Sequence, residues 1–207
     1  MTLVALSAAY GAGGSRIGPE LAERLGVPFV DRAIPLAVAQ RLRVPIDDAT
    51  AHDHRTLGWL ERMLGGFVAG DSGAPAPVPP DSASSDDFRR ATEEVILNRA
   101  ATGEGVILGR ASVVVLRDDP RALRVRLHGT PERRLHQAIE LGAPDREAAE
   151  HALRRSDRAH AEYVRRFYGA RLDDPSLYHL TLDSTAIALD VCVDLIAEVA
   201  TGWSARR

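Results

Sequence analysis

Near its N-terminus the chain carries Thr2-Leu3-Val4-Ala5-Leu6-Ser7, followed closely by Gly11-Ala12-Gly13-Gly14-Ser15. The first run is short, apolar and partly β-branched, which is typical of a buried strand. The apolar residues after the glycines have helical spacing: Ile17, Leu21, Ala22, Leu25. We expect Ser15 to be the N-cap of this helix and Gly26 to end it. A strand, a glycine loop and a helix in this order predict an α/β protein.

Strands and helices continue to alternate along the chain. We expect further strands at 27–30, 105–108, 123–128 and 178–182, and helices at 33–43, 48–64, 87–101, 145–168 and 186–200, with one more introduced by Thr130-Pro131. This alternation predicts one domain, 1–207, with a mostly parallel sheet between two layers of helices. Ligands bind such sheets at the carboxyl ends of the strands, so we expect the site there.

The glycine loop has the chemistry of a phosphate site. Backbone amides of Gly11, Ala12, Gly13, Gly14 and Ser15 would form a concave cluster of donors at a helix N-terminus. The phosphate-loop template G-x-x-x-x-G-K-[ST] is matched at two of its four defined positions, by Gly13 and Ser15. Ala8 stands at its first glycine and Gly14 at its lysine. Arg16 is the nearest side chain that could supply the missing positive charge.

A dinucleotide site is an alternative interpretation of the same loop. Gly11-x-Gly13-x-x-Arg16 matches two of the three glycines of G-x-G-x-x-G. Asp31 stands where the acidic residue that binds a ribose would be expected. The missing third glycine makes this the poorer of the two matches.

Composition excludes several classes of protein. The 207 residues carry a net charge of −3 and one cysteine, Cys192, which argues against nucleic-acid polymers as partners and against a disulfide framework. No apolar run suggests a membrane span, and we expect a cytoplasmic protein. All 26 basic residues are arginines, so any lysine-based chemistry must be absent or carried by a guanidinium group.

Several segments together resemble the cytidylate-kinase-like branch of the phosphate-loop nucleoside monophosphate kinases. The resemblance covers nearly the whole chain and rests on 9–18, 21–32, Gly109-Arg110, Asp157-Arg158 with Tyr163 and Tyr168, and Tyr178-x-Leu180-x-Leu182-Asp183-Ser184. It implies a phosphate-loop kinase fold with a helical lid. It also implies transfer of a phosphoryl group from ATP, with Mg²⁺, to CMP or dCMP.

The same resemblance implies roles for particular residues. The loop from Gly11 to Ser15, with Arg16, would bind ATP, and the Ser15 hydroxyl would bind Mg²⁺. Residues 31–87 would form the acceptor region, with Asp31, Arg32 and Arg110 as acceptor ligands and a mobile loop at 65–86. Residues 145–170 would form the lid. Helical spacing places Arg154, Arg158 and Arg165 on one face, and with Arg16 and Arg110 the first two are our candidate catalytic residues.

A second class of function also fits the sequence. Ala8, Gly14 and Ala111 stand where an active enzyme of this kind normally has functional residues, so the chain could be a nucleotide-binding regulatory protein that keeps the fold without the reaction. Three further predictions concern structure alone. We expect Asp183-Ser184-Thr185 to cap the last helix, Tyr163 and Tyr168 to be packing residues, and Cys192 to lie in the core.

Overall fold

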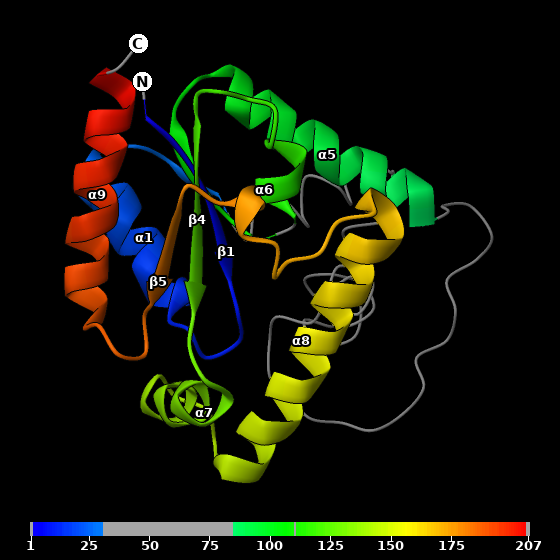
Figure 1. The fold of residues 1–207 in the computed structure, drawn as a ribbon, viewed down its shortest axis with the longest axis vertical. Coiled ribbons are helices and arrows are strands. Elements are labelled where there is room, and N and C mark those ends of the chain that lie inside the picture. The colour runs from blue at the N-terminus through cyan, green and yellow to red at the C-terminus, as the bar shows by residue number, and fades with distance from the viewer. Residues whose placement is uncertain (1, 31–84, 110, 206–207) are drawn as a thin grey trace, which may run out of the picture.

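The computed structural model describes residues 2–30, 85–109 and 111–205. The N-terminal part holds β1 (Leu3–Ala8), α1 (Gly14–Leu25) and β2 (Phe29–Val30). The remaining elements are α5 (Ser85–Ala101), β3 (Gly105–Leu108), α6 (Ser112–Val115), β4 (Ala122–His128), α7 (Pro131–Glu140), α8 (Arg146–Tyr168), the 3-10 turn η1 (Pro175–Leu177), β5 (Leu180–Asp183) and α9 (Leu189–Ala205). Figure 1 shows their arrangement.

The five described strands form one parallel sheet in the order β2-β3-β1-β4-β5. β1 is central, since Leu3 lies opposite Gly105 of β3 on one side and Ala122 of β4 on the other. The predicted α/β class is therefore confirmed. In the 3-2-1-4-5-6 order of dinucleotide-binding sheets the first two strands are neighbours. Here β3 lies between β1 and β2, which counts against the dinucleotide alternative.

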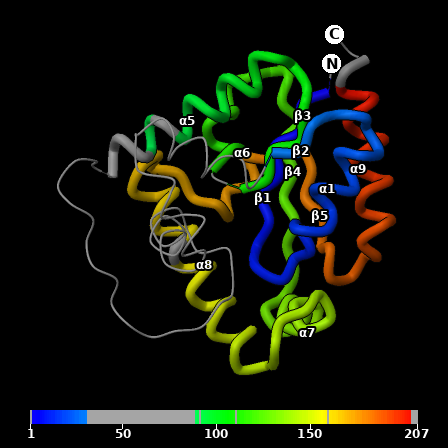
Figure 2. The backbone as a smooth tube through the Cα atoms, turned by 180° about the vertical axis from the view of Figure 1, so that it is seen from behind, coloured from blue at the N-terminus to red at the C-terminus, as the bar shows by residue number. Residues whose placement is uncertain are grey.

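Helices cover both faces of the sheet. Val4 and Leu6 of β1 lie in a buried cluster with α1 and α9, whereas Leu3 and Ala5 lie in a second cluster with α5, α6 and the C-terminal half of α8. Alternate residues of a strand point to opposite faces, so the two clusters are the two cores of a three-layer fold. The ribbon in Figure 1 and the tube in Figure 2 both show α1 and α9 on one side of the strands and α5 and α6 on the other.

The three predicted core or packing residues are where we expect them. Cys192 is fully buried in the cluster under α9. Tyr163 is buried in the opposite cluster, and Tyr168 packs against that cluster. The Tyr163 ring lies 6.0 Å from that of Tyr168 and 5.0 Å from that of Phe167, in tilted or edge-on arrangements that aromatic pairs prefer.

Beyond the carboxyl ends of the strands, α7 packs against the N-terminal half of α8 (Figure 1). Thr130 accepts a hydrogen bond from the amide of Arg133, and Pro131 is the first residue of α7. Asp145 caps α8 by accepting from the amide of Ala148 at 2.8 Å. The predicted starts of both helices are confirmed, because each depends on capping signals that are local in sequence.

Some predicted boundaries are wrong. The structure begins α5 at Ser85, inside the predicted 65–86 loop, and α9 at Leu189 instead of 186. It also contains α6 and η1, which are too short to show a helical period in the sequence. The predicted helices at 33–43 and 48–64, and the rest of the 65–86 loop, lie outside the described residues. Within the described part of the chain, no helix is both long and apolar enough to span a membrane.

Candidate functional site

The glycine loop lies where four parallel strands end. β1, β3, β4 and β5 end at Ala8, Leu108, His128 and Asp183, and parallel strands place their carboxyl ends at one edge. The connection that follows β1 leads to β2 on one side of the sheet, whereas the connection that follows its neighbour β3 leads to β4 on the other side. The switch in strand order therefore lies between β1 and β3. The loop is therefore at the position where open α/β sheets bind ligands.

Two glycines give the loop its path. Gly11 and Gly13 have φ values of 75° and 74°, a left-handed conformation that costs other residues about 1–2 kcal/mol. Gly13 is the N-cap of α1, and its carbonyl accepts from the amide of Ile17 at 2.9 Å. The prediction that Ser15 caps α1 is therefore wrong, because the helix begins at Gly14. Ser15 lies in its first turn and is exposed.

Three consecutive backbone carbonyls of the loop accept hydrogen bonds from side chains outside the loop. The Tyr10 carbonyl accepts from Arg134 Nη1 at 2.9 Å, and the Gly11 carbonyl accepts from Gln137 Nε2 at 3.0 Å. The Ala12 carbonyl accepts from Ser184 Oγ at 2.8 Å. Arg134 and Gln137 are one turn apart on α7, so this helix and the residue after β5 together fix the loop. Sequence reasoning missed Arg134 and Gln137 and gave Ser184 another role.

The loop amides are left available. In a trans peptide the carbonyl of one residue and the amide of the next point in opposite directions, so anchoring the Tyr10 and Ala12 carbonyls turns the Gly11 and Gly13 amides to the other side. The amides of Gly11, Gly13, Gly14 and Ser15 donate to none of the residues that the structure describes. Such a set of donors at a helix N-terminus suits a phosphate group.

Packing explains the residue at position 14. A Cβ atom on Gly14 would lie 2.5 Å from the Cβ of Ala8 and 3.2 Å from Cδ1 of Leu108. The Ala8 methyl thus occupies the space that a side chain at position 14 would need. Ala8 and Gly14, the two residues that depart from the phosphate-loop template, therefore depend on each other. The methyl group at position 8 leaves no space for a side chain at position 14.

Arg16 does not lie over the loop in this structure. Its Nε is 2.9 Å from Oε1 of Glu20, one turn along α1, and both side chains are about half exposed. Exposed pairs at this spacing contribute only about 0.3–0.5 kcal/mol. A phosphate dianion could therefore draw Arg16 away from Glu20 at little cost.

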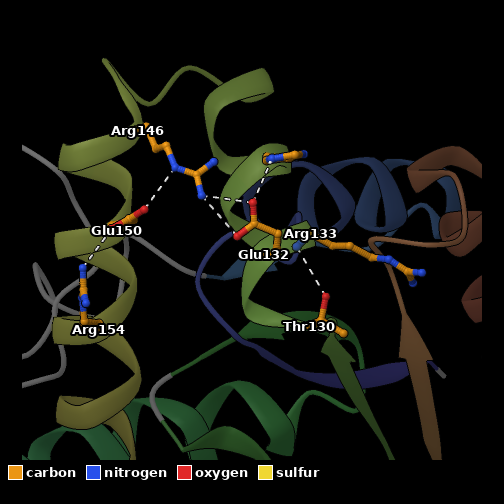
Figure 3. A network of polar contacts seen from close by, with 7 residues as sticks. Thr130, Glu132, Arg133, Arg146, Glu150 and Arg154 are labelled. Carbon is orange, nitrogen blue, oxygen red and sulfur yellow. Dashed lines mark hydrogen bonds and ion pairs between the residues drawn. The ribbon is translucent and has the colours of Figure 1, made fainter.

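The two candidate catalytic arginines of α8 are also exposed and paired within their helix. Arg154 pairs with Glu150 and Arg158 with Glu162, each at 2.9 Å. Arg146 joins Glu150 to Glu132 of α7, as Figure 3 shows, and its hydrogen bonds lower the pKa of the Glu132 carboxyl. The helix predicted over 145–168 is thus present, and its two candidate catalytic residues make only solvent-screened contacts.

Asp31, Arg32 and Arg110, the predicted acceptor ligands, lie outside the described residues. The two neighbours of position 110 are described, and both have left-handed backbone conformations, with φ values of 72° for Gly109 and 59° for Ala111. Ala111 is also the N-cap of α6. The chain therefore turns sharply directly after β3, at the same edge of the sheet as the glycine loop.

The segment Asp183-Ser184-Thr185 does not cap α9, contrary to our prediction. Asp183 Oδ1 accepts from the amide and the hydroxyl of Thr185, at 3.1 and 2.6 Å, which lowers the pKa of the Asp183 carboxyl. α9 begins four residues later, at Leu189. Ser184 is fully buried, and its hydroxyl donates a hydrogen bond to the Ala12 carbonyl. The segment closes a local turn and anchors the loop.

Ser184→Ala should lower the free energy of unfolding by about 1–3 kcal/mol, because it leaves the buried Ala12 carbonyl without this donor. Urea denaturation measures the loss. Ser112→Ala is the control, since Ser112 is equally buried but its hydroxyl lies 3.5 Å from its acceptor, the Ile107 carbonyl, away from the loop. Equal losses in the two variants would show that the anchor at Ser184 contributes nothing specific.

Comparison with known proteins agrees with this geometry. The model of the Cytidylate kinase-like family matches residues 3–186. Among solved structures, an uncharacterized protein from Eubacterium ventriosum ATCC 27560 is 17% identical, with a TM-score of 0.65 and coverage of 97% of this chain and 99% of that chain. Shikimate kinase from Bacteroides thetaiotaomicron is 16% identical, with a TM-score of 0.52 and coverage of 96% and 97%. These likenesses show the phosphate-loop kinase fold. No curated protein matches the chain.

Proposed function

The chain belongs to the cytidylate kinase-like family, and on that premise we propose that it transfers the γ-phosphoryl group of ATP to CMP or dCMP. The observation that carries the proposal is the glycine loop. Its carbonyls are anchored by three outside side chains, and its amides at Gly11, Gly13, Gly14 and Ser15 share one uncapped helix N-terminus. A loop built in this way fits the phosphates of a nucleotide.

The donor phosphates would be bound mainly by backbone. The loop amides would hold the β-phosphate, and Arg16, released from Glu20, would contact phosphate oxygens beside it. Ser15 is exposed in the first turn of α1, and its hydroxyl would hold Mg²⁺ together with those oxygens, because Mg²⁺ prefers oxygen ligands. When bound, Mg²⁺ would neutralise part of the phosphate charge.

Charge stabilisation would come from arginines. Phosphoryl transfer requires positioning and neutralisation more than covalent chemistry by the protein. Arg154 and Arg158 of α8 are held only by exposed pairs with Glu150 and Glu162, so they are free to exchange these carboxylates for a phosphoryl group. Asp31, Arg32 and Arg110 complete the proposal as ligands of the acceptor.

One observation favours a second candidate, a nucleotide-binding regulatory protein. The methyl group of Ala8 and the side chain of Leu108 fill the space beside position 14, so the loop has no room for the lysine of the phosphate-loop template. Such a loop could bind phosphates through its amides and still lack the cation that supports transfer.

An assay of ADP release decides between the two candidates. ATP and Mg²⁺ are supplied with CMP, dCMP, UMP, AMP, GMP or shikimate, the last because of the likeness to a shikimate kinase fold. We expect CMP or dCMP to give a kcat/KM at least about tenfold above every other acceptor, a difference of about 1.4 kcal/mol in transition-state binding. Calorimetric binding of ATP without turnover on any acceptor would instead support the regulatory protein.

A further inference from the structure

Arg134 is buried, and it is the one charged residue that is buried in the described part of the chain. Its guanidinium group nevertheless has four short contacts. Nε donates to the Gly129 carbonyl at 3.1 Å, and Nη1 donates to the Tyr10 carbonyl at 2.9 Å. Nη1 and Nη2 also donate to the two carboxylate oxygens of Asp157, at 3.1 and 2.7 Å. These contacts join three separate segments: the glycine loop, the end of β4 and α8.

The backbone of Arg134 also shapes the loop. A Cβ atom on Gly11 would collide with the carbonyl oxygen of Arg134, so the loop at this point packs directly on α7. The side chain then holds the preceding carbonyl, that of Tyr10. One residue thus contacts two successive loop residues, through its backbone and through its guanidinium group.

Asp157 connects this contact to the arginines of α8. It lies between Arg154 and Arg158 in the sequence and on the same continuous helix, α8. A bidentate pair between a carboxylate and a guanidinium group fixes orientation as well as distance. The pair therefore sets how α8, with its two candidate catalytic residues, is placed relative to the glycine loop.

We infer that Arg134 and Asp157 are positioning residues: their ion pair holds the glycine loop in its phosphate-binding conformation and holds Arg154 and Arg158 in register with it. The catalytic part of this inference rests on the proposed function, whereas the part that concerns the loop does not. Without Arg134, the Tyr10–Gly11 peptide loses the bond that keeps the Gly11 amide directed toward the ligand side.

The chain offers a matched control for this pair. Arg146 and Glu132 also join α8 to α7, at 3.0 Å, but they are exposed and contact no residue of the loop. Glu132→Gln therefore weakens the contact between α7 and α8 without changing any contact of the glycine loop. Any effect that Arg134→Gln or Asp157→Asn shares with Glu132→Gln reflects helix packing alone.

Hydrogen exchange in the nucleotide-free protein tests the loop. We expect Arg134→Gln to speed exchange of amides in residues 10–15 at least about tenfold, corresponding to about 1.4 kcal/mol of lost local stability, and Glu132→Gln to leave it unchanged. Unchanged exchange in folded Arg134→Gln would overturn the inference. If that variant does not fold, Arg134→Lys and the neutral pair Arg134→Gln with Asp157→Asn are measured in its place.

Enzyme kinetics test whether the ion pair holds Arg154 and Arg158 of α8 in position relative to the glycine loop. Asp157→Asn leaves the two carbonyl contacts of Arg134 in place, so we expect ADP affinity within about threefold of the original and kcat at least about tenfold lower. In Arg134→Gln we expect both the affinity for ADP and kcat to fall. Variants that behave like Glu132→Gln would refute the positioning role. If the unaltered protein neither binds nor turns over nucleotide, the proposed function fails, and hydrogen exchange still decides the role of the pair in the loop.

Discussion

Gly11→Ala is expected to lower nucleotide affinity by about 100-fold or more and to reduce the free energy of unfolding by about 2–4 kcal/mol. Two costs add. Alanine disfavours the φ of 75° at this position, and its methyl would collide with the Arg134 carbonyl and lie 2.8 Å from the carbon of that group. The obstacle is helix backbone, which cannot turn away as a side chain can. Either the loop or α7 must move.

Gly26→Ala separates the two costs. Gly26 ends α1 with a φ of 66°, and a Cβ there would meet nothing within 4 Å. This variant has the backbone strain without the collision, so we expect a loss of about 1 kcal/mol and unchanged nucleotide affinity. Calorimetric titration with ADP and urea denaturation measure both quantities. An affinity for Gly11→Ala equal to that of Gly26→Ala would show that the packing of the loop on α7 is unimportant.

Gly14→Lys, which restores the lysine of the phosphate-loop template, is expected to harm the protein. The new Cβ would lie 2.5 Å from the methyl of Ala8, and overpacking of this kind costs about 1–3 kcal/mol. In an Ala8→Gly background that methyl is absent, and the same substitution should be tolerated. The two positions should therefore show a coupling of at least about 1 kcal/mol in a double-mutant cycle.

The cycle needs four proteins: the original, each single variant and the Ala8→Gly, Gly14→Lys double variant. Their free energies of unfolding come from urea denaturation, and their ADP affinities from calorimetry. If Gly14→Lys costs the same in both backgrounds, the contact between positions 8 and 14 does not determine which residue position 14 accepts. Turnover of the double variant on CMP then shows whether the loop gains from an ammonium group.

The sequence predicted what depends on neighbours in the chain. The strand before the glycine loop, the cap at Thr130 and the long helix α8 all have signals within a few residues. Arg134, Gln137 and Ser184 could not be recognised as anchors of the loop, because their partners are 124, 126 and 172 residues away. Only the folded sheet brings these segments together.

Two local predictions failed for physical reasons. Ser15 was expected to cap α1, but a left-handed Gly13 allows the helix to begin earlier without a side-chain cap. Ser184 was expected to cap α9, but its hydroxyl has a buried carbonyl within reach and the turn after β5 is closed by Asp183. The sequence also could not show why position 14 is a glycine, because the reason is the position of Ala8 and Leu108 beside it in the folded chain.

The distant anchoring of the glycine loop has a consequence for biosynthesis. The loop residues are synthesised before their anchors, and the hydroxyl that donates to the Ala12 carbonyl is synthesised 172 residues later. At about 5–20 residues per second this delay is roughly 10–30 s. Throughout that time the Ala12 carbonyl of the nascent chain lacks this donor, so the loop reaches its fully anchored conformation only after Ser184 has been synthesised. Under the proposed function, tight nucleotide binding would therefore begin only once Ser184 has folded against the loop.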